Sequence, residues 1–205
     1  MRANASRNWA AEDPKRPEPH VGLGYIAWRN HKQSEGNEHF GKALALGANS
    51  PKLLWDFARM STGTKPEEAE KALTALVDQE PKNAEYRMTL ATLQMNRQKF
   101  AEALATIRPI NHVTTTQERD RILYIRASAA LRAGDRVEAK KIAEELKRLT
   151  TVPDFTAQAE EILRYLQQPN AGASPQRVNG VLVATKTIRG ALVEVNLRGW
   201  HSHGP

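Results

Sequence analysis

Histidines are the first residues of this sequence to test for chemistry, because they can bind metals or transfer protons at neutral pH. The chain has six. A zinc peptidase needs His-Glu-x-x-His on one helix, and that pattern is absent. His31 and His39 are separated by an expected turn, so they share no helix face. His201 and His203 could contact a metal, but the tail offers no third ligand. We therefore expect no metal site.

Acidic pairs and glycines give no better catalytic pattern. Glu67 and Glu68 are adjacent, so on a helix their carboxylates diverge and cannot flank a substrate. The segment Gly22-Leu23-Gly24 lacks the preceding strand and following lysine of a phosphate-binding loop. We interpret it as a helix-packing position. The sequence thus predicts no catalytic residues, no cofactor and no enzymatic activity.

Composition narrows the class of protein. The chain has 205 residues, of which 40% are hydrophobic, enough for a continuous core. It has no cysteine, which excludes disulfides and thiolate metal sites. Residues 1–10 contain no apolar run long enough for a signal peptide or a membrane span. We expect a cytoplasmic location and no membrane partner.

The net charge of +7 raises the question of nucleic-acid binding. Residues 17–170 carry 22 Lys and Arg against 20 Asp and Glu, so most of the excess lies at the two ends. A nearly balanced middle is a poor surface for following phosphates. Nucleic acid is therefore an unlikely partner, and RNA binding through the basic ends is a third, weaker hypothesis.

A repeated spacing of small and large residues organises the elements. In residues 83–108, Leu90-Ala91 is followed by Ala103 and Ile107 at fixed offsets, with a polar break near Asn96. Such a pattern predicts two amphipathic helices that share a seam, since small residues let the backbones approach. The same offsets recur from Leu23-Gly24 and Arg126-Ala127, and from Phe57-Ala58 with one residue missing in the turn around Gly63.

This pattern resembles the tetratricopeptide repeat (TPR), a 34-residue helix-turn-helix unit. Gly36, Ala69, Ala103 and Ala139 carry the resemblance in the second helices, and Pro81-Lys82-Asn83 matches the usual close of a unit. Ala48, Thr115 and Thr151 depart from it where that proline is expected, as does Arg126 where a large apolar residue is expected. The resemblance implies an all-α fold, a right-handed α-solenoid.

The expected organisation follows from caps and breakers. Pro17, Ser50-Pro51, Thr115 with Glu118, and Asp135 with Glu138 are typical of helix starts, and Gly47 of a helix end. We expect a partial repeat or cap at 1–16. Four repeats then cover 17–152, divided as 17–50, 51–83, 84–117 and 118–152.

The rest of the chain changes character. A single helix at 153–168 should cover the end of the stack, and 169–177 is a linker by composition. Val181-Leu182-Val183 and Leu192, Val193 and Val195 predict a short β-hairpin over 178–198, with a turn at Arg189-Gly190. The tail 199–205 is expected to be disordered. A hairpin alone is marginal in water, so it is also a possible route to self-association.

The resemblance also implies a binding groove, because the first helix of each pair lines the concave wall of such a solenoid. The groove residues are rich in Trp, Tyr and Met, which anchor protein interfaces, although each aromatic could instead fill the core between repeats. The chaperone-binding members of the family grip a carboxylate with Lys, Asn and Arg, whereas here the matching positions are Val21, Tyr25, Asp56, Glu85 and Thr89. The expected groove residues are Tyr25, Trp28, Arg29, Trp55, Arg59, Met88, Thr92, Met95, Tyr124 and Ser128.

The sequence therefore favours a scaffold that binds an apolar peptide or partner helix with an acidic group near Arg59. The alternative is a helical accessory region of a larger, peptidase-like enzyme whose catalytic domain is absent from this chain.

Overall fold

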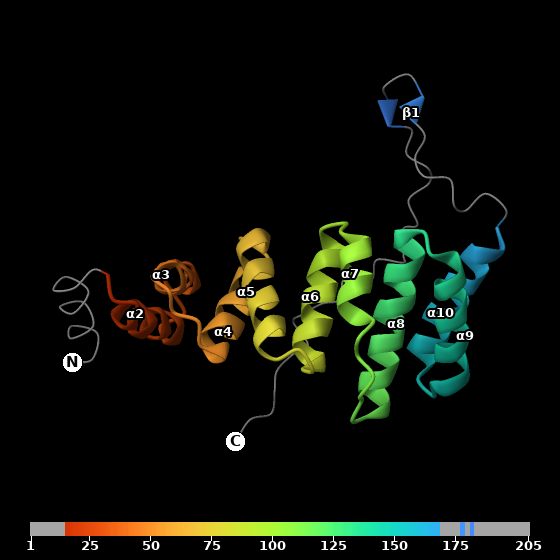
Figure 1. Ribbon diagram of the computed structural model, residues 1–205, viewed down its shortest axis with the longest axis horizontal. Helices are drawn as coiled ribbons and strands as arrows, with labels where there is room; N and C mark the ends of the chain where they lie inside the picture. Colours follow the sequence, from red (N-terminus) through yellow and green to blue (C-terminus); the bar gives the residue numbers. More distant parts are fainter. Residues whose placement is uncertain (1–14, 169–176, 179–180, 183–205) are drawn as a thin grey trace. The chain divides into compact units, whose positions relative to one another are not determined.

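The computed structural model describes residues 15–168, 177–178 and 181–182, and in them the fold is helical apart from two very short strands (Figure 1). Two compact units divide between Leu93 and Gln94, within α6, and each is described by itself. The first unit contains α2 (Glu18–Arg29), α3 (Gln33–Ala45), α4 (Pro51–Ser61), α5 (Pro66–Gln79) and most of α6 (Ala84–Asn96). The second contains α7 (Phe100–Ile107), α8 (Thr116–Ala133), α9 (Arg136–Leu149) and α10 (Pro153–Gln167). The helices expected between residues 17 and 168 are all present. The right-handed stacking of successive pairs stays a prediction.

Glycine decides how closely α2 and α3 pack. A Cβ placed on Gly24 would lie 2.4 Å from two ring carbons of Phe40, and one on Gly36 would lie 3.1 Å from the Gly24 carbonyl oxygen. Real Cβ atoms do not approach a ring so closely, so only glycine at position 24 leaves room for the fully buried Phe40. The interpretation of Gly22-Leu23-Gly24 as a packing position is confirmed for Gly24.

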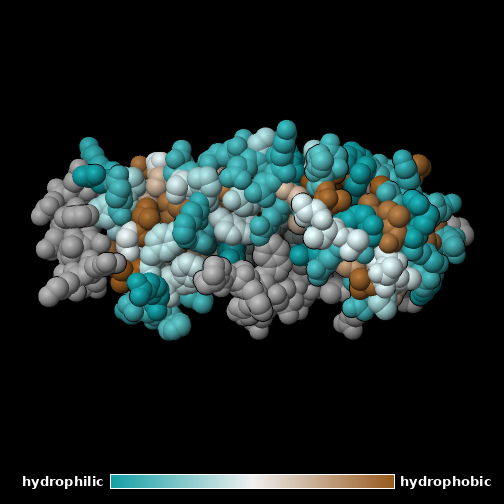
Figure 2. Space-filling view, turned by 90° about the horizontal axis from the view of Figure 1, so that it is seen from below, coloured by the Kyte–Doolittle hydropathy of each residue, from teal (hydrophilic) through white to brown (hydrophobic). Residues whose placement is uncertain are grey.

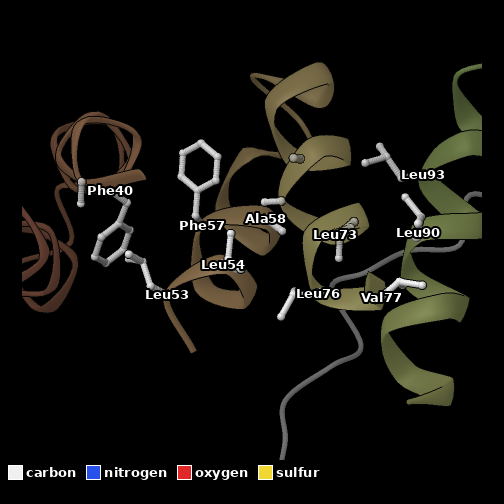
Figure 3. Close-up of a cluster of buried hydrophobic side chains, with 13 residues drawn as sticks. Phe40, Leu53, Leu54, Phe57, Ala58, Leu73, Leu76, Val77, Leu90 and Leu93 are labelled. Carbon is white, nitrogen blue, oxygen red and sulfur yellow. The ribbon is translucent and has the colours of Figure 1, made fainter. Parts of the chain in front are cut away.

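The core of the first unit is continuous from α3 to α6. Phe40, Phe57 and Leu73 come from three successive helices, and each is at most 2% exposed (Figure 3). Leu90 and Leu93 of α6 belong to the same cluster. These are the repeated large residues of the sequence pattern, and their burial is what holds neighbouring helices together.

The residues at the end of α3 and the start of α4 largely explain where these helices stop and begin. Gly47 has φ +95°, a left-handed conformation that suits glycine, and it ends α3 as expected. Pro51 lies in the first turn of α4 after the extended Ser50. Ser50 holds the N-cap position, but its side chain makes no capping hydrogen bond. The start of α4 therefore depends on the proline more than on the serine.

In the second unit α10 packs against both α8 and α9. Ile142, Ala143 and Leu146 of α9 form a buried cluster with Ala159 and Ile162 of α10. Tyr124 and Leu131 of α8 and Phe155 of α10 pack at its edge. α10 has no following helix partner among the described residues, and it buries its apolar face on this hairpin.

Two polar caps begin the helices of that hairpin. The Thr115 hydroxyl accepts a hydrogen bond from the Glu118 amide at 3.1 Å, and the Glu118 carboxylate accepts from the Thr114 amide at 2.8 Å. The Thr114 amide and hydroxyl, which both donate to the Glu118 carboxylate, hold the pKa of Glu118 below its usual value. At α9, Asp135 accepts from the Glu138 amide at 3.0 Å. Both predicted N-caps are confirmed.

Asp135 and Glu138 were expected to form a capping box at the start of α9, but the Glu138 carboxylate does not complete it. Instead it accepts hydrogen bonds from Arg108 at 3.0 Å and from Arg126 at 2.8 Å. The Arg108 hydrogen bond, assisted by the one from Arg126, lowers the pKa of Glu138. This explains why an arginine stands where the repeat expects a large apolar residue: Arg126 forms a half-buried ion pair across the α8–α9 hairpin.

Asp120 links the beginning of α8 to the end of α9. It is 1% exposed, and its carboxylate accepts from Arg119 at 2.7 Å and from the Thr150 hydroxyl at 2.6 Å. Arg119 also donates to the Leu149 carbonyl at 2.9 Å. A buried carboxylate is tolerated because its oxygens are hydrogen-bonded.

The carboxyl-terminal strands differ from expectation in their pairing. β1 (Arg177–Val178) pairs antiparallel with β2 (Val181–Leu182), with Val178 opposite Val181. This pairing does not support the predicted hairpin, which placed its strands at 181–183 and 192–195 and assigned Arg177 to the linker. The predicted partner strand at 192–195, the turn at Arg189-Gly190, the tail 199–205 and most of the segment 1–16 lie outside the described residues.

Candidate protein-binding surface

The first helices of the first unit place a group of aromatic and basic side chains at the surface. Trp28 on α2 is 38% exposed, and Tyr25 and Trp55 are half-buried. Arg29 and Arg59 are exposed in the last turns of α2 and α4, where a cation is favoured by the helix dipole. We call this set the aromatic face. It comprises Tyr25, Trp28, Arg29, Lys52, Trp55, Arg59 and Tyr86.

Tyr25 is fixed by a hydrogen-bonded triad with α4. Its hydroxyl donates to the Asp56 carboxylate at 2.7 Å, and Lys52 donates to both of these groups, at 2.6 Å to Asp56 and 3.2 Å to Tyr25. Burial, and then the bond to Asp56, raise the pKa of Tyr25, and the same carboxylate raises the pKa of Lys52. The Tyr25 ring packs edge-on against Phe40 with centroids 4.8 Å apart. Tyr25 is therefore rigid, which reduces the entropy lost when a ligand packs on it.

Trp55 forms the second part of the aromatic face. Its ring centroid lies 5.1 Å from that of Tyr86 on α6, and the Arg59 guanidinium carbon lies 6.0 Å from the same indole ring. Trp28 lies 6.2 Å from Tyr25 by ring centroids. Aromatic rings with a cation at one side suit an apolar ligand that carries negative charge.

Two expected groove residues in the first unit do not reach the surface. Met88 and Thr92 are each 7% exposed. Both belong to α6, and the positions chosen there by repeat offset are buried. The expectation that they offer contact area is therefore corrected.

Three expected residues fall in the second unit, where the structure gives them other surroundings. Met95 is half-buried near the end of α6. Tyr124 hydrogen-bonds with Ser128, burial raises its pKa, and its ring lies 6.3 Å from that of Phe155 on α10. Tyr124 thus contributes to the packing of α10 as well as to the surface.

Three residues on or beside the aromatic face were not among the expected groove residues. They are Lys52, Asp56 and Tyr86. A signal for them was present, because Tyr25 meets Asp56 and Trp55 meets Tyr86 across the same separation of 31 residues. Both separations are slightly less than one repeat. Searching for polar or aromatic residues 31 positions after each expected groove residue would have found Asp56 and Tyr86.

The described part of the chain contains no group of three or more His, Cys, Asp or Glu that could hold a metal ion. Among the same residues no helix is both long and apolar enough to cross a bilayer. On the surface seen in Figure 2, small apolar patches are separated by polar side chains.

Comparison with known proteins agrees with the repeat pattern. Residues 64–127 match the family model of the tetratricopeptide repeat. No curated protein matches the sequence significantly.

Solved structures give the same fold at low sequence identity. YrrB, described as a TPR protein with an unusual peptide-binding site, is 15% identical over 78% of this chain and 81% of its own, with a TM-score of 0.60. A tetratricopeptide repeat protein from Parabacteroides merdae is 17% identical over 79% and 66%, with a TM-score of 0.56. PilF from Pseudomonas aeruginosa is 17% identical over 72% and 68%, with a TM-score of 0.53.

Proposed function

We propose that this chain, whose residues 64–127 match the family model of the tetratricopeptide repeat, is a scaffold whose aromatic face binds a peptide segment or helix of a partner protein. The observation that carries the proposal is the exposure of Trp28 beside the rigid Tyr25, with Arg59 next to Trp55. Aromatic and arginine side chains are the residues that most often dominate binding energy at protein interfaces. That YrrB is described as having a peptide-binding site supports the same class of ligand.

The charges on the aromatic face favour a partner segment with both apolar and acidic residues. Lys52 is paired with Asp56, whereas Arg29 and Arg59 stand exposed at the ends of their helices. The Asp56 carboxylate is 7% exposed and satisfied by two donors, so it should repel an acidic group less than a free carboxylate would. The acidic residue of the partner is therefore expected near Arg59. Whether the surface extends to Met95, Tyr124 and Ser128 is a further part of the proposal.

We propose binding without catalysis, in a cytoplasmic setting, because members of this family generally act as scaffolds. Self-association through a carboxyl-terminal hairpin stays a prediction.

The direct test is peptide selection followed by affinity measurement. Peptides selected from a random library on the full chain should combine apolar and acidic residues. In fluorescence anisotropy, Trp28→Ala should weaken their binding by tenfold or more, as loss of an interface anchor does. Arg59→Ala should weaken it about threefold and reduce the dependence on salt.

Val137 gives a matched control, because it is an apolar residue that is 83% exposed on α9, in the other unit. Val137→Ala should leave the affinity unchanged. A Trp55→Ala, Arg59→Ala double variant should lose most of the binding, and circular dichroism must show that it remains folded, because Trp55 is half-buried. Equal affinities for the wild type, Trp28→Ala and the double variant would end the proposal.

A further inference from the structure

A cavity of about 390 Å³ opens among α3, α4 and α5 of the first unit, apart from the aromatic face. Its walls are mostly apolar. Leu54 and Phe57 of α4, both labelled in Figure 3, form one side of it. Residues of α3, of the segment that follows it and of α5 form the rest. The lining residues are Gly41, Leu44, Ala45, Ala48, Leu54, Phe57, Glu68, Lys71 and Ala72.

The cavity exists because this repeat differs from the others on the outer side of its second helix. Five and nine residues after Gly36 stand Gly41 and Ala45. At the same offsets after Ala69 on α5 and Ala139 on α9, every residue is polar or charged and exposed: Thr74, Asp78, Glu144 and Arg148. An outer helix side normally faces water with polar residues. A hollow with small apolar residues at those two positions is therefore a local departure from the pattern of the same chain.

The charges at the mouth of the cavity are not balanced. The Glu68 carboxylate lies 3.6 Å from the Lys65 ammonium group, so its charge is partly compensated. Lys71, one helical turn further along α5, is exposed and has no ion pair within the part of the chain that the structure describes. An apolar hollow with an unpaired ammonium group at its edge suits an apolar ligand that carries a carboxylate.

We propose that this cavity is a second binding site, which receives one large apolar side chain of a partner polypeptide that has an acidic residue directly beside it. The volume lies in the range of ligand pockets. The acidic residue pairs with Lys71, and the apolar side chain packs on Leu54, Phe57 and Ala72. The first unit then offers two separate surfaces, and this one uses the second helices.

The test uses the full chain and a blocked dipeptide as probe, observed by methyl NMR. N-acetyl-Asp-Phe-amide should shift the methyl resonances of Leu44, Leu54 and Ala72 and saturate at a dissociation constant on the order of 1 mM. N-acetyl-Lys-Phe-amide should bind about threefold more weakly, and N-acetyl-Asp-Ala-amide should cause no saturable shift. The first comparison tests the charge and the second tests the apolar anchor.

Variants of the chain assign the site. Gly41→Leu should abolish the shifts by filling the cavity, and it should fold, because a Cβ at Gly41 is 3.6 Å from Phe57, an ordinary contact. Ala45→Leu, at an exposed position of the wall, gives a second way to block it. Lys71→Glu should reverse the preference between the Asp and Lys probes, whereas Lys82→Glu, an exposed lysine outside the lining, should not.

Three results would overturn the proposal. One is an equal response to all three probes, and another is unchanged binding to a folded Gly41→Leu or Ala45→Leu variant. The third is a shift of the same methyl groups with protein concentration alone, which would assign the cavity to contact between copies of the chain. Trp28→Ala should leave the probe affinity unchanged, so failure here is distinguishable from failure of the aromatic face.

Discussion

Two glycines on adjacent helices show how one side chain can set the distance between two elements. A Cβ added to Gly24 would overlap the ring of Phe40, whereas a Cβ added to Gly41 would meet Phe57 at 3.6 Å, an ordinary contact distance. They have the same residue type and both lie inside helices, but their neighbours differ. The structure therefore predicts opposite effects for the same substitution.

Gly24→Ala should lower the free energy of unfolding by about 1–3 kcal/mol, because the added methyl group overlaps the Phe40 ring and the tight core cannot relax fully. This net loss includes the gain of nearly 1 kcal/mol that alanine brings to a helix. Gly41→Ala should be neutral or stabilising by up to about 1 kcal/mol. Urea unfolding measures both, and equal effects of the two substitutions would contradict the packing argument.

A histidine pair between α2 and α3 makes stability depend on pH. His20 and His39 lie with their Nδ1 atoms 3.1 Å apart, so one ring donates to the other, and both cannot carry a proton on Nδ1. Burial is the main cause that lowers the pKa of His20, and the charge of Lys42 adds to it. Burial also lowers the pKa of His39, with smaller contributions from His20 and Lys42. Glu35 and Glu38 act in the opposite direction on His39.

A lowered pKa in the folded state means that the unfolded chain binds protons more readily, so stability is complete above the ordinary histidine pKa of about 6.5 and falls at lower pH. We expect the wild type to lose more stability between pH 7.5 and pH 5.5 than His39→Gln does. Urea unfolding at the two pH values tests this. His31→Asn, at an exposed histidine with φ 59°, serves as the control, since asparagine tolerates this conformation. If His39→Gln and the wild type keep the same pH dependence, the pair does not titrate as inferred.

At the scale of elements, the start of α8 depends on its side-chain cap more than the starts that have a proline do. α2, α4, α5 and α10 each have a proline in the first turn and no side-chain cap. α8 has no such proline, and Thr115 satisfies the amide of Glu118 instead. Without that bond an amide at the helix start would lack a partner.

Thr115→Ala should therefore cost about 1 kcal/mol of stability. Thr116→Ala changes the same residue type one position later, inside the exposed first turn, and should cost much less. Thermal unfolding followed by circular dichroism compares the two variants. A loss for Thr116→Ala as large as that for Thr115→Ala would mean that the cap is not the cause.

At the scale of the whole chain, the two compact units have separate hydrophobic clusters. Leu73 is fully buried in the cluster of the first unit, and Leu146 is fully buried in that of the second. In repeat proteins stability is close to a sum of local terms and nearest-neighbour contacts. A destabilising substitution in one cluster should therefore lower the local stability mostly of the helices that form that cluster.

Leu73→Ala should cost about 2–5 kcal/mol locally and raise amide hydrogen exchange in α4 and α5, while exchange in α9 and α10 changes little. Leu146→Ala should give the reverse pattern. Native-state exchange read by mass spectrometry checks both variants in the full chain. A uniform rise over all helices in each variant would show that the chain unfolds as one cooperative unit.

Much of the fold could be predicted from the sequence because it is set by local and periodic information. The recurring pairs such as Leu23-Gly24 and Leu90-Ala91 predict helices that pack in succession, and Gly47 and Thr115 mark where helices end and begin. Caps, turns and apolar periodicity act within a few residues, so reading them needs no tertiary information.

The sequence by itself determined the repeat class, the helix positions and which side chains fill the seams. Only the tertiary structure decided which surface residues remain accessible: it buries Met88 and Thr92, leaves Trp28 exposed, and assigns Glu138 to two arginines instead of its own helix end. It also opened the hollow beside Gly41. Exposure and charge pairing depend on side chains that lie 12 to 30 positions away in the case of Glu138, and these meet only after neighbouring helices pack, so no local pattern records those contacts.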